Sequence, residues 1–247
     1  MTKGVVSYQC SCVGINFKNY KIVINEFPLL GFAIKADGYN LEIDVELIDI
    51  FDKSTANDLA YHAVYKLLDH ICLMFLVRIG EPRQICISLP QKEESGVRLK
   101  IQNIYQKSSI DHIQLQYSPD TKCLDSLKMQ IENRWRHRNV LIRLFRNSIS
   151  QEDPVTRYLL LYNVLLFANS DKQKELEICI ISIDPNVEKK PSPKDNKPET
   201  IYTRLRNEIG HARQEVESQK TITEITEHLS KFTNIVKQVV LNHKLSE

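Results

Sequence analysis

Hydrophobic and polar residues alternate in the first 120 residues with the period of two that is typical of strands in a half-buried sheet. The alternation is clearest after Asp37-Gly38, a dipeptide typical of a hairpin turn. We therefore predict strands at 29–36 and 39–50 on either side of this turn. In the second strand, apolar Leu41, Ile43, Val45 and Leu47 alternate with acidic Glu42, Asp44 and Glu46.

A sheet that carries one helix is the simplest fold for this half of the chain. Apolar residues at helical spacing predict a long helix from Ser54 or Thr55 to about Val77, and Gly80 and Pro82 should end it. The remaining predicted strands are 20–25, 84–89, 97–105 and 111–117.

From about residue 121 the glycines almost disappear and the hydrophobic period becomes that of helices. The apolar helix after Asp153-Pro154 should be buried on all sides. Residues 185–199 hold four of the nine prolines and predict a loop. The other predicted helices are 124–147, 171–183, the segment from 201, and a last helix that starts at the capping box Thr221–Glu224 and ends near His243. The predicted class is therefore α+β, with a mixed α/β sheet region at 1–120 and an all-α bundle of four or five helices at 121–247.

Composition adds limits to this picture. The 247 residues are 42% hydrophobic and 26% charged with a net charge of +2, values typical of a globular protein and too neutral to indicate nucleic acid by bulk charge. The first residues lack a secretory pattern, and the longest apolar run, 71–77, is too short to span a bilayer. We expect a cytoplasmic protein with no membrane partner and with reduced cysteines.

Neither a metal nor another cofactor is expected. Cys10 and Cys12 could form half of a metal site, but no second Cys or His pair has ligand spacing. The acidic residues that alternate along the strand at 39–50 should face solvent. His62, His70 and His112 lie among apolar neighbours without matching ligands and are interpreted as structural. Asn163 is either a satisfied core amide or a residue that faces a cleft.

The strongest candidate chemistry lies in the segment Arg206-Asn207-Glu208-Ile209-Gly210-His211. Arginine offers a planar fork of N–H donors that matches phosphate oxygens. Histidine titrates near neutral pH, so it can accept or donate a proton. Cleavage of a phosphodiester needs both functions and can proceed with them alone.

On an ideal helix, Asn207 and His211 are i,i+4 neighbours on the polar face, and Arg206 and Arg213 lie on its flank. Arg206 and His211 are about 140° apart, which is awkward for one phosphate. Two copies of the chain across a two-fold axis could form one composite site. The opposite, apolar face is formed by Ile201, Leu205, Ile209, Ala212 and Val216.

A basic patch surrounds the single tryptophan, Trp135. Residues 124–148 contain six Lys or Arg and two Asp or Glu, a local net charge of +4 (6 − 2). This composition suits RNA, which takes cations at its phosphates and aromatic rings on its bases. Trp135 packed in a core beside solvated arginines explains the pattern equally well. The candidate RNA-binding residues are Arg136, Arg138 and Arg143 here and Arg204 and Arg213 near the motif.

The C-terminal half resembles the HEPN superfamily, and its nearest branch is the MauJ-like and ApeA-like proteins. The resemblance rests on the apolar helix TRYLLLYNVLLFA, a variable loop, a helix with the pattern I-Y-x-x-x-R-N-x-x-x-H, and a long closing helix. It covers 121–247 well and 1–120 loosely. It implies a homodimer formed through the bundle and a metal-independent endoribonuclease activity in prokaryotic defence or stress.

The resemblance also implies roles for three residues. His211 would act on the attacking 2′-hydroxyl or on the leaving oxygen, Arg206 would stabilise the developing phosphorane charge, and Asn207 would hold His211 or contact the phosphate. The N-terminal region would sense a ligand or bind a regulatory protein. Arg213 stands where one HEPN subgroup has an acceptor tyrosine, which argues against that subgroup. The alternative is a non-catalytic module for dimerisation or for nucleotide or partner binding.

Overall fold

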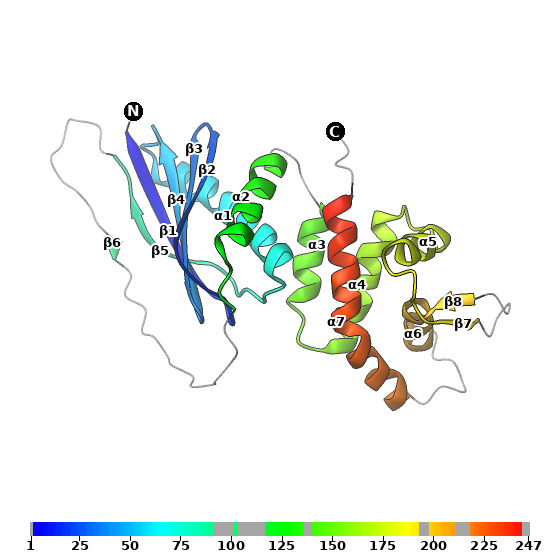
Figure 1. Cartoon of the computed structure of the whole chain (residues 1–247). Helices are drawn as coiled ribbons and strands as arrows, with labels where there is room; N and C mark the ends of the chain where they lie inside the picture. The colour runs from blue at the N-terminus through cyan, green and yellow to red at the C-terminus, as the bar shows by residue number, and fades with distance from the viewer. Residues whose placement is uncertain are drawn as a thin grey trace. The chain divides into compact units, whose positions relative to one another are not determined.

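The computed structural model describes residues 2–90, 101–102, 117–135, 140–192, 198–210 and 218–243. The chain forms two compact units, 1–138 and 139–247 (Figure 1). The first contains an antiparallel sheet with helices and the second consists mainly of helices, so the α+β class is confirmed. We predicted the division after residue 120, and the structure places it after residue 138.

The first unit is built on one antiparallel sheet with the strand order β2-β3-β4-β1-β5-β6. The predicted strands at 20–25, 29–36, 39–50 and 84–89 are confirmed, but β1, which lies inside the sheet, was not predicted. Of the segments 97–105 and 111–117, only 101–102 and Tyr117 lie within the described residues. The strands are β1 Lys3–Ser11, β2 Asn16–Glu26, β3 Leu29–Asp37, β4 Asn40–Ile48, β5 Arg83–Ser88 and β6 Ile101–Gln102.

The turn between β3 and β4 follows from its two residues. Gly38 has a φ of 95°, which glycine adopts without a Cβ clash. Asp37 Oδ1 accepts hydrogen bonds from the backbone N–H groups of Tyr39 and Asn40, at 3.0 and 2.8 Å. The apolar side chains of β4 are fully buried and its acidic ones are not, so the predicted alternation is confirmed.

Two helices pack in the first unit. Helix α1 (Lys53–Phe75) is capped by Asp52 and contacts β1 and β4. It stops before the predicted breakers Gly80 and Pro82, because Leu76 takes a left-handed conformation with a φ of 55°. Helix α2 (Thr121–Arg134) contacts α1 and β2.

Trp135 belongs to the core of the first unit. Its ring meets Phe32 of β3 edge to face at 5.4 Å between centroids, and its exposed fraction is 7%. Tyr20 of β2 donates a hydrogen bond to Asp125 of α2 at 2.7 Å. The packing interpretation of Trp135 is therefore confirmed, and α2 belongs with the sheet rather than with the C-terminal helices.

His70 of α1 is expected to make the first unit sensitive to acid. Its side chain is buried and its Nδ1 atom has no hydrogen-bond partner among the described residues. Burial, followed by the charges of Lys66 and Arg134, lowers the pKa of His70 to about 4. An unfolded histidine titrates near 6.5, so between these values the unfolded chain binds a proton that the folded chain does not.

Stability should consequently fall by about 2–3 kcal/mol as the pH drops from 6.5 towards 4.5. Urea unfolding followed by the fluorescence of Trp135 measures this change. In His70→Leu the decrease should be largely absent, whereas His62→Leu, at an exposed position of the same helix, should retain it. If stability fell equally with pH in the wild type and in His70→Leu, groups other than His70 would control the pH response.

The second unit contains five helices and one small hairpin among its described residues. The single helix predicted at 124–147 is wrong, because α2 and α3 belong to different units. The loop predicted at 185–199 is wrong at 189–191 and 198–199, where β7 and β8 pair. The elements are α3 Val140–Ile149, α4 Pro154–Ala168, α5 Gln173–Ile183, β7 Lys189–Pro191, β8 Pro198–Thr200, α6 Ile201–Gly210 and α7 Ser218–Asn242.

Aromatic rings from α4, α6 and α7 form the core of the second unit. The Phe232 ring lies 4.8 Å from that of Tyr158 and 4.7 Å from that of Tyr202, and all three side chains are buried. The Tyr158 hydroxyl donates to the Tyr202 carbonyl at 2.6 Å, which ties α4 to α6. This core requires the three helices to approach closely.

Helix α4 begins as predicted, with Asp153 accepting a hydrogen bond from the Thr156 N–H at 2.7 Å and Pro154 in the first turn. It is not buried on all sides, because Asn163 is exposed and Phe167 is 53% exposed. The interpretation of Asn163 as a core amide is therefore wrong, and the interpretation of it as a residue that faces a cleft stays a prediction. Helix α5 starts at Gln173 with Lys172 as its N-cap, two residues after the start of the predicted helix 171–183.

Candidate functional site

Helix α6, which carries the Arg206 motif, starts directly after strand β8. Thr200 closes the strand, and its hydroxyl accepts a hydrogen bond from the Thr203 N–H at 3.3 Å. Such a bond satisfies one of the backbone donors that every helix start leaves open. Ile201 and Leu205 are buried as predicted, and Ile209 is half-buried. The rest of the predicted apolar stripe, Ala212 and Val216, lies outside the described residues.

Asn207 lies inside the unit and not on an outward polar face as we predicted. Its exposed fraction is 8%. Its Nδ2 donates to Glu199 Oε2 at 3.1 Å, and its Oδ1 accepts from Arg206 Nη1 at 3.0 Å. The prediction was wrong because α6 has neighbours on several sides, namely α4, α7 and both hairpin strands.

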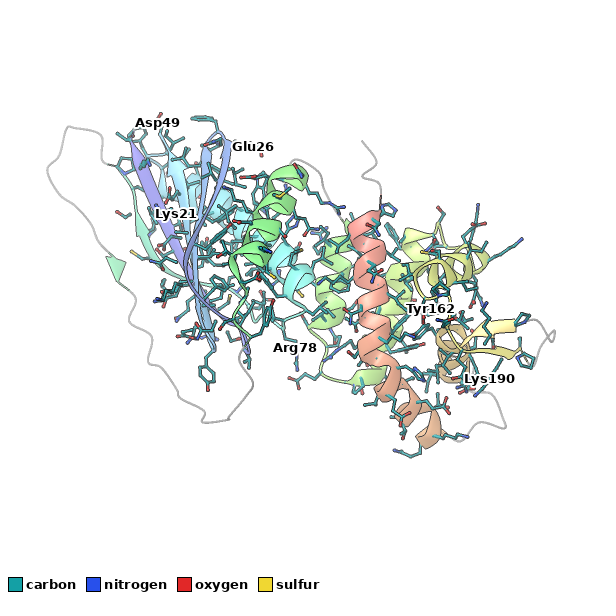
Figure 2. All side chains as sticks on the ribbon, in the orientation of Figure 1. Lys21, Glu26, Asp49, Arg78, Tyr162 and Lys190 are labelled. Carbon is teal, nitrogen blue, oxygen red and sulfur yellow. The ribbon has the colours of Figure 1, made fainter. Side chains whose placement is uncertain are left out.

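Arg206 is half-buried and contacts both an amide and an aromatic ring. The Asn207 amide accepts from its guanidinium, whose Cζ atom lies 5.7 Å from the centre of the Tyr162 ring. A cation over an aromatic face is attracted by the negative face of the ring. Tyr162 belongs to α4 and is labelled in Figure 2. The described part of the motif thus presents a guanidinium in a defined position.

A half-buried carboxylate on α5 fixes the start of the same helix. Glu177 accepts from the Thr200 N–H and hydroxyl, each at 3.1 Å, and from the Thr203 hydroxyl. Thr203 Oγ1 also lies 3.1 Å from the hydroxyl oxygen of Tyr162. Burial raises the pKa of Tyr162 to about 12, so its hydroxyl keeps its proton at neutral pH. Glu177 and Tyr162 therefore link α5 and α4 to the motif helix.

Arg204, predicted to contact RNA, has carboxylate partners within its own chain. It pairs with Glu208 at 2.6 Å and with Glu224 of α7, and its side chain is 13% exposed. Glu208 also accepts a hydrogen bond from Thr221 at 2.9 Å. Thr221 and Glu224 lie within α7 and bind residues of α6, so the prediction that they form a helix-starting capping box is wrong.

The structure describes only part of the predicted site. Arg206, Asn207 and Arg204 lie together on α6, and Arg143 is exposed on α3. Arg146, beside Arg143 in the basic patch, is buried. The other site residues predicted from the sequence lie outside the described residues. These are His211, Arg213, Arg136 and Arg138.

Three features bear on the cofactor, cysteine and membrane predictions. Within the described ranges, no three His, Cys, Asp or Glu side chains gather in a group that could hold a metal ion. The six cysteines, all of them described, are thiols that form no disulfide. None of the helices in the part of the chain that the structure describes has the length and apolar character needed to cross a membrane.

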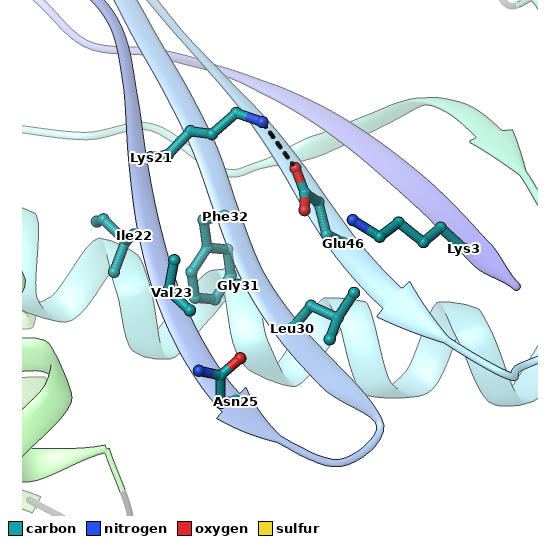
Figure 3. Close-up of a pocket in the computed structure, with 9 residues that line it drawn as sticks. All are labelled: Lys3, Lys21, Ile22, Val23, Asn25, Leu30, Gly31, Phe32 and Glu46. Carbon is teal, nitrogen blue, oxygen red and sulfur yellow. Dashed lines mark ion pairs between the residues drawn. The ribbon is translucent and has the colours of Figure 1, made fainter. Parts of the chain in front are cut away.

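A pocket of about 170 Å³ lies on the sheet of the first unit (Figure 3). Lys21 pairs with Glu46 at 3.6 Å beside it. Gly31 belongs to its lining, and a Cβ on this residue would meet the Ile22 carbonyl oxygen at 2.1 Å, so the neighbouring backbone requires glycine. The pocket is smaller than the sites of about 300–1,000 Å³ that hold drug-sized ligands. It shares no residue with the predicted site.

The sequence analysis missed Glu199, Glu177 and Tyr162 as members of this arrangement. Thr200 could have indicated the start of α6. Threonine is favoured at helix starts, and Thr200 directly precedes an apolar helical pattern. Nothing in the sequence indicated that Glu177 would contact Thr200, which lies 23 residues later in the chain. Glu199 belongs to segment 185–199, whose composition predicted a loop, so there was no reason in the sequence to place it in a site.

The chain was compared with protein-family models, with curated proteins and with solved structures, and none of the three comparisons gave a match.

Proposed function

We propose that this chain is a metal-independent endoribonuclease of the HEPN type. The observation that carries the proposal is the placement of Arg206, whose guanidinium donates to the Asn207 amide and lies over the Tyr162 ring. A cation that is already ordered stabilises a transition state without a cost of reorganisation during the reaction. His211 follows five residues later and supplies the proton transfer.

In the proposed reaction, His211 removes the proton from a ribose 2′-hydroxyl. The 2′-oxygen attacks the adjacent phosphorus, and the bond to the 5′-oxygen of the next nucleotide breaks as that oxygen takes up a proton. Arg206 stabilises the additional negative charge on the phosphoryl oxygens. The products are a 2′,3′-cyclic phosphate and a 5′-hydroxyl. A second copy of the chain would bring its own Arg206 and His211 to the same linkage.

The remaining predicted residues take supporting roles. Asn207 is buried and holds Arg206, so we assign it to positioning rather than to contact with RNA. Arg143 is exposed and suits a phosphate contact, as do Arg136, Arg138 and Arg213 in the proposal. A phosphate at Arg204 would have to compete with Glu208 and Glu224. We place the protein in the cytoplasm, in a defence or stress response that the first unit controls by binding a ligand or regulatory protein.

The test is incubation of the purified chain with mixed RNA at neutral pH, with and without EDTA. The expected result is cleavage at rates that agree within about twofold, because the proposed proton transfer and charge stabilisation come from side chains. Raising the salt should weaken binding, because the phosphate contacts release counterions. Loss of cleavage in EDTA, restored by added Mg²⁺, would contradict the mechanism.

A non-catalytic nucleotide-binding module is the second candidate. It is favoured because the side chains of Arg204 and Asn207 bind other side chains of the same chain. Such contacts are expected if the motif helix has a structural function. This candidate predicts no RNA cleavage and a rise in thermal midpoint when a nucleotide is added. Expression of the intact chain in cells, followed by measurement of growth and RNA integrity, separates this module from a nuclease that needs a cellular trigger.

A further inference from the structure

We propose that Glu199 is a positioning residue for the Arg206 guanidinium and acts through Asn207. This inference rests on the proposed function, because it assigns a purpose to the order that Glu199 gives to the motif. Glu199 lies on β8, two residues before α6 begins, and its exposed fraction is 7%. It lies outside the segment Arg206–His211 that carries the candidate chemistry.

The contacts form one chain from the hairpin to the guanidinium. Glu199 Oε2 accepts from Asn207 Nδ2 at 3.1 Å, and Asn207 Oδ1 accepts from Arg206 Nη1 at 3.0 Å. Both Glu199 and Asn207 are buried, where a hydrogen bond is stronger than in water and its loss costs more. Arg206 is only half-buried, so its exposed side can face a substrate.

The direction of these bonds explains how a carboxylate reinforces the orientation of Asn207. An asparagine side chain has a donor end and an acceptor end of nearly equal shape, so only its partners decide which way it points. An ionised carboxylate accepts and cannot donate, and it therefore selects the NH₂ end of Asn207. The carbonyl end must then face Arg206, which can only donate. A glutamine at position 199 could accept or donate, so the orientation of Asn207 would then be selected by Arg206 alone.

A second support reaches Arg206 through Tyr162 of α4. Glu177 accepts from the Thr203 hydroxyl, which lies 3.1 Å from the Tyr162 hydroxyl, and the Tyr162 ring lies beneath the guanidinium. The guanidinium would therefore be only partly released by loss of Glu199. We expect a reduced catalytic rate and not a complete loss of activity.

The experiment compares Glu199→Gln with the wild type in steady-state cleavage of RNA. The expected result is a kcat lower by about ten- to a hundredfold with a KM within about twofold, as for a misplaced catalytic group. The matched control is Glu188→Gln. Glu188 is an exposed carboxylate just before the same hairpin and is paired with Lys190 at 2.9 Å. Its replacement should leave kcat and KM unchanged.

A reciprocal exchange provides the specific readout. In Glu199→Gln combined with Asn207→Asp, the amide and the carboxylate trade places, and the carboxylate now at position 207 can accept from both neighbours. This double variant should recover most of the lost kcat, whereas Asn207→Asp alone places two carboxylates together and should be impaired. A merely structural role of Glu199 would not produce such a recovery.

An RNA-independent measurement separates this inference from the proposed function. The Nε–Hε signal of Arg206 in an NMR spectrum is assigned with Arg206→Lys. In Glu199→Gln, and not in Glu188→Gln, its heteronuclear NOE should decrease as the guanidinium becomes more mobile. If the wild type cleaves no RNA while the NOE decreases, the proposed function fails and the positioning stands. An unchanged NOE, or an unchanged kcat in an active enzyme, overturns the positioning role.

Discussion

Replacement of His211 with alanine is expected to lower the rate of RNA cleavage by at least about a hundredfold. The variant retains Arg206 and its ordered guanidinium but loses the group that we propose as the acceptor of the 2′-hydroxyl proton, and such groups contribute about 10²–10⁴-fold. The measurement is a single-turnover cleavage assay, which isolates the chemical step from product release.

The matched control for this prediction is His243→Ala, which removes an imidazole just after α7. It should cleave RNA at the wild-type rate. Near-ultraviolet circular dichroism of both variants verifies that their aromatic cores remain packed. Cleavage by His211→Ala at the wild-type rate would remove histidine from the mechanism.

Phe232→Ala is expected to lower the free energy of unfolding of the second unit by about 3–5 kcal/mol. The side chain is fully buried among the rings of Tyr158, Tyr162 and Tyr202, so its removal leaves a cavity at the junction of three helices. Urea unfolding followed by the helical signal at 222 nm measures the change. The transition of the helical unit should move to a lower urea concentration.

Phe167→Ala is the matched control, because this phenylalanine of α4 is 53% exposed. Its replacement should change the free energy of unfolding by less than about 1 kcal/mol. Phe232→Ala should also impair cleavage near its lowered transition, because Tyr162 packs on both Phe232 and Arg206. Equal effects of the two substitutions would show that the aromatic cluster is not the core of the unit.

The strands were predictable where a local pattern decided their structure. The alternation in β4 and the Asp37-Gly38 turn specified one hairpin before any tertiary contact was considered. Strand β1 also alternates in burial, but its buried face mixes valine with Tyr8 and Cys10, and its other face carries Ser7 and Gln9. This pattern is too weak to distinguish a strand from irregular chain.

The helices show where periodicity stops being informative. The helical period continues across Trp135, although α2 and α3 belong to different units. Periodicity reports that each segment can form a helix with one apolar face, and it contains no information about whether two segments share an axis or a core. The packing of Trp135 against Phe32 comes from a residue far away in the sequence.

The sequence predicted which segment carries the candidate site but not which side chains contact one another there. A polar residue opposite an apolar stripe is expected to face solvent, and this rule placed Asn207 outside. The structure buries it because Glu199 supplies a partner from a segment rich in proline and lysine. Thr221 and Glu224 likewise match a capping box, yet they bind Glu208 and Arg204 of α6. Buried polar pairs have no periodic signature, so sequence patterns do not reveal them.

The chemical ends of the RNA products test the central claim most directly. An oligoribonucleotide cleaved by the wild-type chain in EDTA is analysed by mass spectrometry, beside the same oligonucleotide with a 2′-deoxyribose at the cleaved position. We predict a 2′,3′-cyclic phosphate and a 5′-hydroxyl from the first and no cleavage of the second. Products with a 3′-hydroxyl and a 5′-phosphate, or cleavage of the deoxy-substituted linkage, would contradict attack by the 2′-hydroxyl.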